Sequence, residues 1–272
     1  MSLLTKVFSG EEQVDRHTIT RGQVLSTLCA ALQPLPYTHA MWEGGAVSWG
    51  RADAWSDIDL MLDVDDGRME EALTEVEHAL ESLSPIELKY RVPDDPAGNY
   101  IQAFYRLRDA DAYLLVDSAV LRHGATSKFL EPEIHGPAIF YFDKSDVSRL
   151  PHFDVAAWQA SRLGDWLADV RTRFEIFQVD VLKELNRANL VEAVAYYHAY
   201  TLRPLLNVLN MRYRPARHNF GTRYVYYELP PEVMARLEPL YLPAGLADLR
   251  AKQAEAQIWF RQVTDEIASL PT

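Results

Sequence analysis

Residues 43–60 constrain the fold and the chemistry of this chain more than any other segment. The alternation of polar and apolar residues from position 57 predicts a strand over residues 57–64, with successive side chains on opposite faces. Asp57 and Asp59 then share one face, while Ile58 and Leu60 point into the core. Carboxylates this close repel each other unless a cation lies between them, and their hard oxygen atoms suit Mg²⁺. The segment therefore predicts a divalent-metal site at the start of a strand.

A pair of glycines precedes these carboxylates. Gly44 and Gly45 follow a predicted short strand at residues 38–42, and glycine allows the backbone to turn sharply and to approach a ligand closely. Backbone N–H groups at such a turn bind phosphate oxygens, most of all where a short helix begins, here at Ala46. A triphosphate bound by this turn would lie beside the metal.

The charge of the chain is unevenly placed. The net charge is −12, and residues 1–150 hold 25 acidic and 13 basic side chains, whereas residues 151–272 hold 14 of each. Because a protein that binds long nucleic acid needs a basic surface, this charge argues against DNA or RNA as the partner. An acidic first half suits divalent cations and cationic acceptors, with simple solubility as the alternative explanation.

Length and composition predict a globular protein of two domains. Of the 272 residues, 48% are hydrophobic and 24% are charged. No apolar run approaches the ~18 residues of a membrane span, and residues 1–15 lack the apolar core of a leader, which predicts a cytoplasmic protein. Cys29 is the single cysteine and lies among leucines at helical spacing, so we expect a buried thiol and no disulfide.

The two halves show different periodicities. In the first half, helices are expected at residues 23–32 and 68–83, and strands at 38–42, 57–64, 86–92, 102–107 and 113–120, with the sheet ending near Val120. In the second half only helical periodicity is present, and helices are expected from residue 154 to 185, at 190–210 with a kink at Pro204, and at 244–267. We expect an α+β chain, with a catalytic domain built on a small mixed sheet at residues 1–150 and an all-α helical bundle at residues 151–272.

The glycine pair and the aspartates together resemble a known signature. Gly44-Gly45, a spacer and Ser56-Asp57-Ile58-Asp59-Leu60 are similar to the Gly-Gly-Ser and Ser-Asp-Ile-Asp-Leu elements of the DNA polymerase β-like nucleotidyltransferase superfamily. Within that superfamily the chain resembles the antibiotic-modifying and minimal types, in which a helical bundle follows the catalytic sheet. The family serine falls on Ala46 here, which leaves Ser48 as its substitute. Glu43 is unusual beside a phosphate-binding loop and should turn away or pair with a base.

The resemblance also implies a set of site residues. Two Mg²⁺ ions would be bound by Asp57, Asp59 and a third carboxylate on a neighbouring strand. Asp117, at the end of an apolar run, is that third ligand or the base that takes the acceptor's proton; the alternatives are that it caps a turn or that Glu87 takes its place. The nucleotide-binding residues would be Gly44, Gly45, Ser48, Arg51 and Ser56.

The second half adds basic residues. Between positions 193 and 227 there are five arginines and no acidic residue. The part around Arg217 and Arg223 resembles the second-domain loop of antibiotic-adenylylating relatives, and we expect this pair to bind the triphosphate. Pairing with Glu184, Glu192 or Glu228 is the alternative. Candidates to line an acceptor pocket are Tyr196, Tyr197, Tyr200 and Tyr224.

The resemblance implies a Mg²⁺-dependent transferase that moves a nucleoside monophosphate, AMP from ATP or that of another nucleoside triphosphate, onto a hydroxyl of a small acceptor. An antibiotic is one candidate acceptor. The sequence leaves the acceptor, the nucleotide and the oligomeric state open, a homodimer included. Two other classes also stay open. One is a catalytically weak, antitoxin-like nucleotide-binding module that acts through protein contacts, and the other is a ribonuclease built on the spacing of Arg212 and His218, which is similar to a motif of HEPN-type helical domains.

Overall fold

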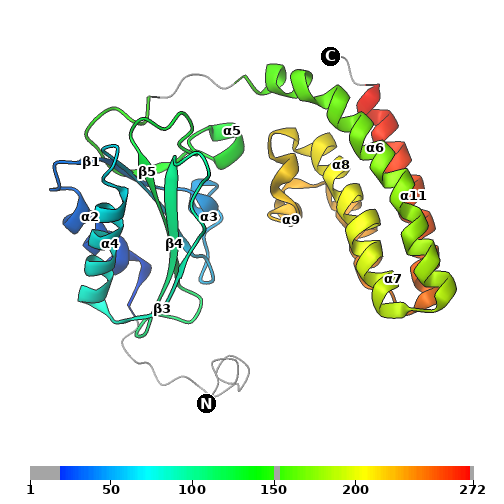
Figure 1. Cartoon of the computed structure of the whole chain (residues 1–272), viewed down its shortest axis with the longest axis horizontal. Helices are drawn as coiled ribbons and strands as arrows, with labels where there is room; N and C mark the ends of the chain where they lie inside the picture. The colour runs from blue at the N-terminus through cyan, green and yellow to red at the C-terminus, as the bar shows by residue number, and fades with distance from the viewer. Residues whose placement is uncertain (1–18, 150–153, 270–272) are drawn as a thin grey trace. The chain divides into compact units, whose positions relative to one another are not determined.

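The computed structural model describes residues 19–149 and 154–269. The chain divides into two compact units, Met1–His152 and Phe153–Thr272. A sheet with helices lies in the first unit and helices build the second, so the predicted α+β fold class is confirmed (Figure 1). The expectation about a leader at residues 1–15 and the predicted boundary between residues 150 and 151 lie outside the described residues.

A six-stranded mixed sheet forms the centre of the first unit. Its strands are β1 (Thr38–Glu43), β2 (Ile58–Val64), β3 (Ile86–Arg91), β4 (Tyr100–Leu107), β5 (Leu115–Arg122) and β6 (Ile139–Asp143). They lie in the order β3-β4-β5-β2-β1-β6. β2 and β5 pair in parallel, and the other neighbours are antiparallel. The two strands predicted to carry the aspartates are therefore adjacent.

Two helices pack on one face of this sheet. α2 (Arg21–Leu32) and α4 (Met69–Leu83) join a common core with buried residues of β2 such as Ile58 and Leu60. The opposite face carries a smaller apolar cluster around Trp42 and Leu121. Cys29 of α2 is half-buried, which corrects the expectation of a fully buried thiol. Because Asp59 alternates with buried residues of β2, it lies on the face away from α2 and α4.

The prediction that the sheet ends near Val120 is wrong, because β6 pairs with β1 at the edge of the sheet. A short helix, α5 (Pro132–His135), precedes this strand. The sequence of β6 has high β-propensity, but Phe142 is its one fully buried residue, so the strand lacks the regular alternation that marks a half-buried strand.

Two long helices, α6 (Val155–Arg187) and α11 (Leu246–Ala268), pack together in the second unit. Phe174 and Phe260 stack between them with ring centroids 3.6 Å apart. The shorter elements between them are α7 (Leu190–Tyr196), η1 (Tyr197–Leu202), α8 (Arg203–Tyr213), η2 (Pro215–Phe220), α9 (Val225–Glu228), α10 (Pro231–Leu237) and η3 (Glu238–Tyr241). Within the described residues, no helix is both long and apolar enough to cross a membrane.

The predicted helix at residues 190–210 is interrupted by a π-helical segment, η1, which ends two residues before Pro204. Proline has no N–H for the carbonyl of residue 200, and its ring would clash with that carbonyl in a regular helix. The Tyr200 carbonyl accepts instead from the side-chain amide of Gln178, with Nε2 2.9 Å from the oxygen. Gln178 is buried, and its Oε1 also accepts from Thr201, 2.8 Å away. The backbone carbonyl that loses its helical partner at this break is thus hydrogen-bonded by a buried side chain of α6.

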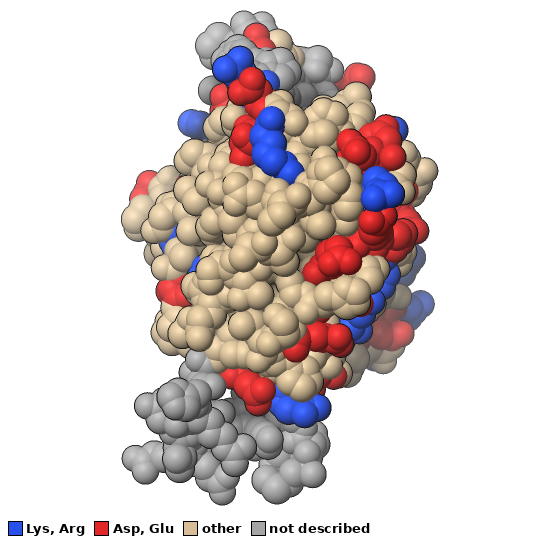
Figure 2. All heavy atoms as spheres, turned by 90° about the vertical axis from the view of Figure 1, so that its left-hand side faces the viewer, with Lys and Arg blue, Asp and Glu red and all other residues tan. Residues whose placement is uncertain are grey.

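Acidic and basic side chains are interleaved on the face of the molecule in Figure 2, where they gather along one flank. Pairs of this kind in the first unit are Arg91 with Glu70, Lys89 with Glu77 and Arg68 with Glu71. Some acidic side chains of the first unit are therefore neutralised by local ion pairs.

Candidate functional site

Asp59 and Asp117 lie opposite each other on adjacent parallel strands. Their Cα atoms are register partners in the pairing of β2 with β5, so both side chains emerge on the same face of the sheet. Asp57 directly precedes β2, and the alternation of half-buried Asp57 and Asp59 with buried Ile58 follows the predicted pattern. The parallel pairing therefore brings residues that are 58 positions apart, 59 and 117, to neighbouring places.

The turn after β1 is built around the Asp59 carboxylate. Gly45 has φ +62°, and a Cβ placed on it would lie 1.6 Å from Oδ2 of Asp59. Gly44 donates its N–H to the backbone carbonyl of Asp59 at 2.9 Å. The short helix α3 (Gly45–Ser48) begins at this point, close to the predicted start at Ala46. Position 45 thus requires glycine for two reasons, a left-handed backbone and the space that the carboxylate occupies.

The aspartates have partners that the sequence analysis did not identify. Gln102 of β4 donates from Nε2 to Oδ1 of Asp117 at 2.7 Å. Arg21 of α2 donates to the backbone carbonyl of Asp57. Both partners come from distant parts of the chain and have no motif, so only the strand order and the packing of α2 could reveal them.

Glu43 is fully buried and pairs with a base, as expected. Its carboxylate forms an ion pair with Arg21, and Oε2 accepts from the hydroxyl of Tyr141 at 2.7 Å. Burial raises the pKa of Tyr141, so the hydroxyl keeps its proton and acts as donor. Arg21 therefore connects the buried Glu43 at the end of β1 with the backbone at the start of β2.

The other predicted nucleotide-binding residues of the first unit are placed as follows. Ser48 is buried, and its hydroxyl donates to the backbone carbonyl of Glu43 at 3.4 Å, so this hydroxyl is directed into the protein. Ser56 exchanges hydrogen bonds with Asp53 in the loop before β2. Arg51 lies over the ring of Trp49, with Cζ 5.4 Å from the ring centroid.

Glu87, the alternative third carboxylate, is excluded as a neighbour of Asp57 and Asp59. It lies on β3, and the sheet order places β4 and β5 between β3 and β2. Its side chain is exposed and lies 3.9 Å from Nε of Arg106. Asp117 therefore remains the carboxylate that is adjacent to Asp59.

Asp57, Asp59 and Asp117 do not form a compact cluster of ligand atoms. Within the part of the chain that the structure describes, a group in which three ligand atoms lie within 4.8 Å of one another is formed by His39, Asp63 and His123. Like-charged carboxylates repel each other, and here the Asp59 carboxylate lies against Gly45 while Asp117 is held by Gln102.

The two arginines predicted to bind triphosphate differ in their surroundings. Arg217 pairs with Glu228, with Nη2 3.1 Å from Oε1, and its side chain is 12% exposed. Glu228 also pairs with the buried Arg214 at 2.9 Å. Arg217 therefore follows the alternative prediction, in which the arginine pairs with Glu228 instead of binding triphosphate. Arg223 is exposed, and its backbone carbonyl accepts from Arg214.

The helical unit contains a cavity of about 620 Å³. Its lining consists of Leu206, Thr222, Val225, Tyr226, Met234, Leu237, Glu238, Pro239, Tyr241 and Leu242. None of the four tyrosines expected around an acceptor is in this set. Tyr197, for example, is buried and donates to the carbonyl of Leu240 at 3.1 Å.

Arg212 and His218, the basis of the ribonuclease alternative, have separate partners. Arg212 lies 3.4 Å from Glu266 of α11. The His218 ring packs edge-on against Trp166, and its Nδ1 lies 3.1 Å from the carbonyl of Pro215. These contacts give each residue a structural role within the helical unit.

Comparison with known proteins gives little further information. No protein-family model matches the chain, and no curated protein matches it. Among solved structures, the crystal structure of an aminoglycoside 6-adenyltransferase from Bacillus subtilis is similar, with 13% sequence identity, coverage of 90% of this chain and 87% of that chain, and a TM-score of 0.34. At this level of similarity the function has to be inferred from the residues of the chain itself.

Proposed function

We propose that this chain is a nucleotidyltransferase, which moves a nucleoside monophosphate from ATP or another nucleoside triphosphate onto a hydroxyl of a small acceptor. The observation that carries the proposal is the register pairing of Asp59 with Asp117. Beside this pair, the turn at Gly45 packs directly on the Asp59 carboxylate. Carboxylates that offer oxygen ligands to a divalent ion, beside a glycine turn that starts a helix, suit in-line phosphoryl transfer.

The three aspartates are of the ligand type that suits Mg²⁺, and an ion would have to draw together carboxylates that lie apart in this structure. They offer hard oxygen atoms only, and Gly45 leaves the space that allows the Asp59 carboxylate to lie against the first turn of α3. When bound, magnesium would neutralise the triphosphate and stabilise the charge that develops at the reacting phosphorus. Asp57, Asp59 and Asp117 would hold it.

In the proposed reaction, the acceptor's hydroxyl oxygen forms a bond to the α-phosphorus, and the bond from that phosphorus to the bridging oxygen of the β-phosphate breaks. Pyrophosphate leaves, and the hydroxyl proton passes to the carboxylate of Asp117. Gln102 fixes the orientation of that carboxylate through its 2.7 Å hydrogen bond. We assign phosphate binding to the backbone N–H of Gly45, because the N–H of Gly44 already donates to the carbonyl of Asp59.

The cavity in the helical unit is a separate candidate site for a small molecule. Its volume of about 620 Å³ is within the range of small-molecule sites. Leucine, valine and methionine form half of the lining, and Glu238 is its one acidic member. We infer that this cavity takes a molecule with an apolar body and a cationic group, which a lincosamide-type molecule matches better than a polycationic aminoglycoside.

The test is pyrophosphate release from ATP and Mg²⁺ across a panel of lincosamides, aminoglycosides and candidate protein acceptors. Asp57→Asn with Asp59→Asn should abolish the release that the best acceptor stimulates. The fold should be retained or stabilised, because the double substitution removes two close like charges. Thermal unfolding measures that part of the prediction.

Glu87→Gln is the matched control, because Glu87 is a carboxylate of the same sheet on a strand away from the site. It should keep full activity. Full activity in the double aspartate variant would overturn the proposal. ATP binding without pyrophosphate release for any acceptor would favour the antitoxin-like binding module.

A further inference from the structure

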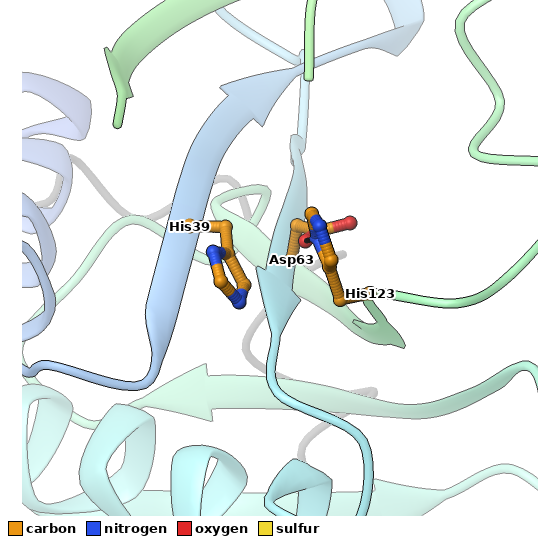
Figure 3. Close-up of side chains that lie close together, drawn as sticks. All are labelled: His39, Asp63 and His123. Carbon is orange, nitrogen blue, oxygen red and sulfur yellow. Dashed lines mark hydrogen bonds and ion pairs between the residues drawn. The ribbon is translucent and has the colours of Figure 1, made fainter. Parts of the chain in front are cut away.

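A second cluster of ligand-type side chains lies at the far end of the strand that carries Asp59. His39 of β1, Asp63 of β2 and His123, which directly follows β5, point toward one another in Figure 3. One ligand atom from each lies within 4.8 Å of the others. Asp63 is four residues from Asp59, or ~13 Å along an extended strand. The cluster is therefore separate from the proposed catalytic aspartates.

The position of His39 results from an irregularity in β1. Thr38 pairs with Val64 and Ala40 pairs with Asp63, so His39 is an extra residue between two consecutive register pairs. A bulge of this kind changes the direction of a side chain relative to a regular strand. His39 thereby lies with Nε2 2.8 Å from Oδ1 of Asp65.

The buried carboxylate of Asp63 has two different partners. Its Oδ1 lies 2.6 Å from Nδ1 of His123, and its Oδ2 forms an ion pair with Lys128. Lys128 also donates to the backbone carbonyl of His123 at 2.8 Å, which anchors the ammonium group on the Oδ2 side. A cation that entered the cluster would thus bind Oδ1 of Asp63, while Oδ2 remained paired with Lys128.

We propose that this cluster binds one divalent transition-metal ion of the zinc type. The ligands would be Nε2 of His39, Nδ1 of His123 and Oδ1 of Asp63, with Asp65 as a fourth ligand. Imidazole nitrogens combined with carboxylates select Zn²⁺, Co²⁺ or Ni²⁺ over Mg²⁺ and Ca²⁺. Ser145 lies 2.8 Å from Nδ1 of His39 and would hold the ring as it binds through the other nitrogen, as partners of metal-bound histidines do.

Metal binding would require one ring to turn. The two imidazoles are stacked, with centroids 3.9 Å apart and an angle of 28° between their planes. An ion lies close to the plane of each imidazole that binds it, and the planes of two stacked rings do not meet near their nitrogens. His123 has a side chain that is 44% exposed against 18% for His39, so His123 is the ring with room to turn. The ion would replace its hydrogen bond to Asp63.

Zn²⁺ and Co²⁺ binding to the full-length, chelator-treated protein tests this proposal directly. Calorimetry should show one Zn²⁺ per chain, with Mg²⁺ unable to compete, and Co²⁺ should give the visible absorption of a site with nitrogen ligands. Zn²⁺ should raise the unfolding temperature, because it binds the folded chain across β1, β2 and the segment after β5. The ring-proton resonances of His39 and His123 should shift as the stack opens.

Variants separate this site from the rest of the molecule. His39→Gln and His123→Gln should each weaken Zn²⁺ binding by at least about tenfold. His78→Gln, a change at an exposed histidine of α4, should leave it unchanged. Asp57→Asn with Asp59→Asn should also leave it unchanged, so a failure of the proposed catalytic function does not affect this test.

Lys128→Gln distinguishes a metal site from a cluster that is held by ion pairs alone. The substitution leaves the Asp63 carboxylate buried with His123 as its remaining partner, so the variant should be less stable without metal. Zn²⁺ should restore its unfolding temperature if the cluster is a metal site. No rescue by Zn²⁺, or undiminished Zn²⁺ binding in both histidine variants, would overturn the proposal.

Discussion

Position 45 links the sequence motif to the geometry of the proposed site. An alanine there would adopt a left-handed backbone and would place its Cβ on the Asp59 carboxylate. Gly50 offers a matched control, since it has φ +63° and nothing within 4 Å of an added Cβ. An alanine at either position would have the same strained backbone, but only at position 45 would its Cβ collide with the Asp59 carboxylate.

Gly50→Ala should therefore lower the free energy of unfolding by about 1–2 kcal/mol, which is the cost of the left-handed backbone. Gly45→Ala should lower it further and should also reduce nucleotidyl transfer, because the Asp59 carboxylate is displaced. Denaturant unfolding and pyrophosphate release measure the two effects. If the two variants lose the same free energy of unfolding and keep the same rate of pyrophosphate release, displacement of the Asp59 carboxylate has no effect on transfer. Asp59 would then not be a metal ligand.

Ala46 stands where the nucleotidyltransferase signature that the sequence resembles has serine, and the Ser48 hydroxyl is buried. Ala46→Ser should strengthen triphosphate binding by about 1.5–3 kcal/mol, the contribution of one hydrogen bond to a charged group. Nucleotide titration with Mg²⁺ checks this, with Ser48→Ala as the control that should leave the affinity unchanged. Unchanged or weaker binding in Ala46→Ser would count against phosphate binding by this loop.

At the residue scale, the sequence predicted the groups that lie within a local pattern. Asp57 and Asp59 follow from strand alternation, and Gly45 follows from its place after a strand. Arg21 and Gln102 could not be predicted, because each reaches the site through the packing of a helix or strand far away in the sequence. The position of the His39 side chain depends on a bulge in the pairing of β1 with β2, which the alternation of residues along β1 does not indicate.

At the element scale, regular periodicity predicted most helices and strands of the described chain to within a few residues. β6 was missed because an edge strand with one buried residue has no alternating pattern. The π-helical segment was missed because it depends on how the chain accommodates Pro204. That accommodation uses Gln178, which belongs to a different helix.

Gln178 is therefore expected to be important for the stability of the helical unit. Gln178→Leu removes the donor to the Tyr200 carbonyl and the acceptor for Thr201, and each buried unsatisfied group costs about 1–3 kcal/mol. Pro204→Ala restores a backbone N–H near Tyr200, so it should stabilise the Gln178→Leu variant more than the parent protein. A double-mutant cycle by denaturant unfolding measures this coupling, and additive effects would contradict the account of the helix break.

At the scale of the whole molecule, the difference in charge between the two halves of the sequence follows the division into two units. The basic stretch of the second unit is partly used for structure, because Glu228 holds both Arg214 and Arg217 in places that solvent hardly reaches. Removing Arg217 would leave part of a buried charge network unpaired. Loss of nucleotide binding in that variant would not distinguish a direct role from a loss of stability.

Arg223 allows the cleaner test, because its side chain is exposed. Arg223→Ala should keep the unfolding temperature and should weaken binding of the Mg²⁺-bound triphosphate by about ten- to a hundredfold, the loss of one charge-assisted contact. Arg173→Ala is the control, since Arg173 is a 70% exposed arginine of the same unit outside this stretch. Arg223→Lys should restore only part of the affinity, because a single ammonium lacks the two-point geometry of a guanidinium. If Arg223→Ala binds nucleotide as tightly as Arg173→Ala does, the expectation that Arg223 binds the triphosphate is wrong, and the arginines of the helical unit serve its own structure.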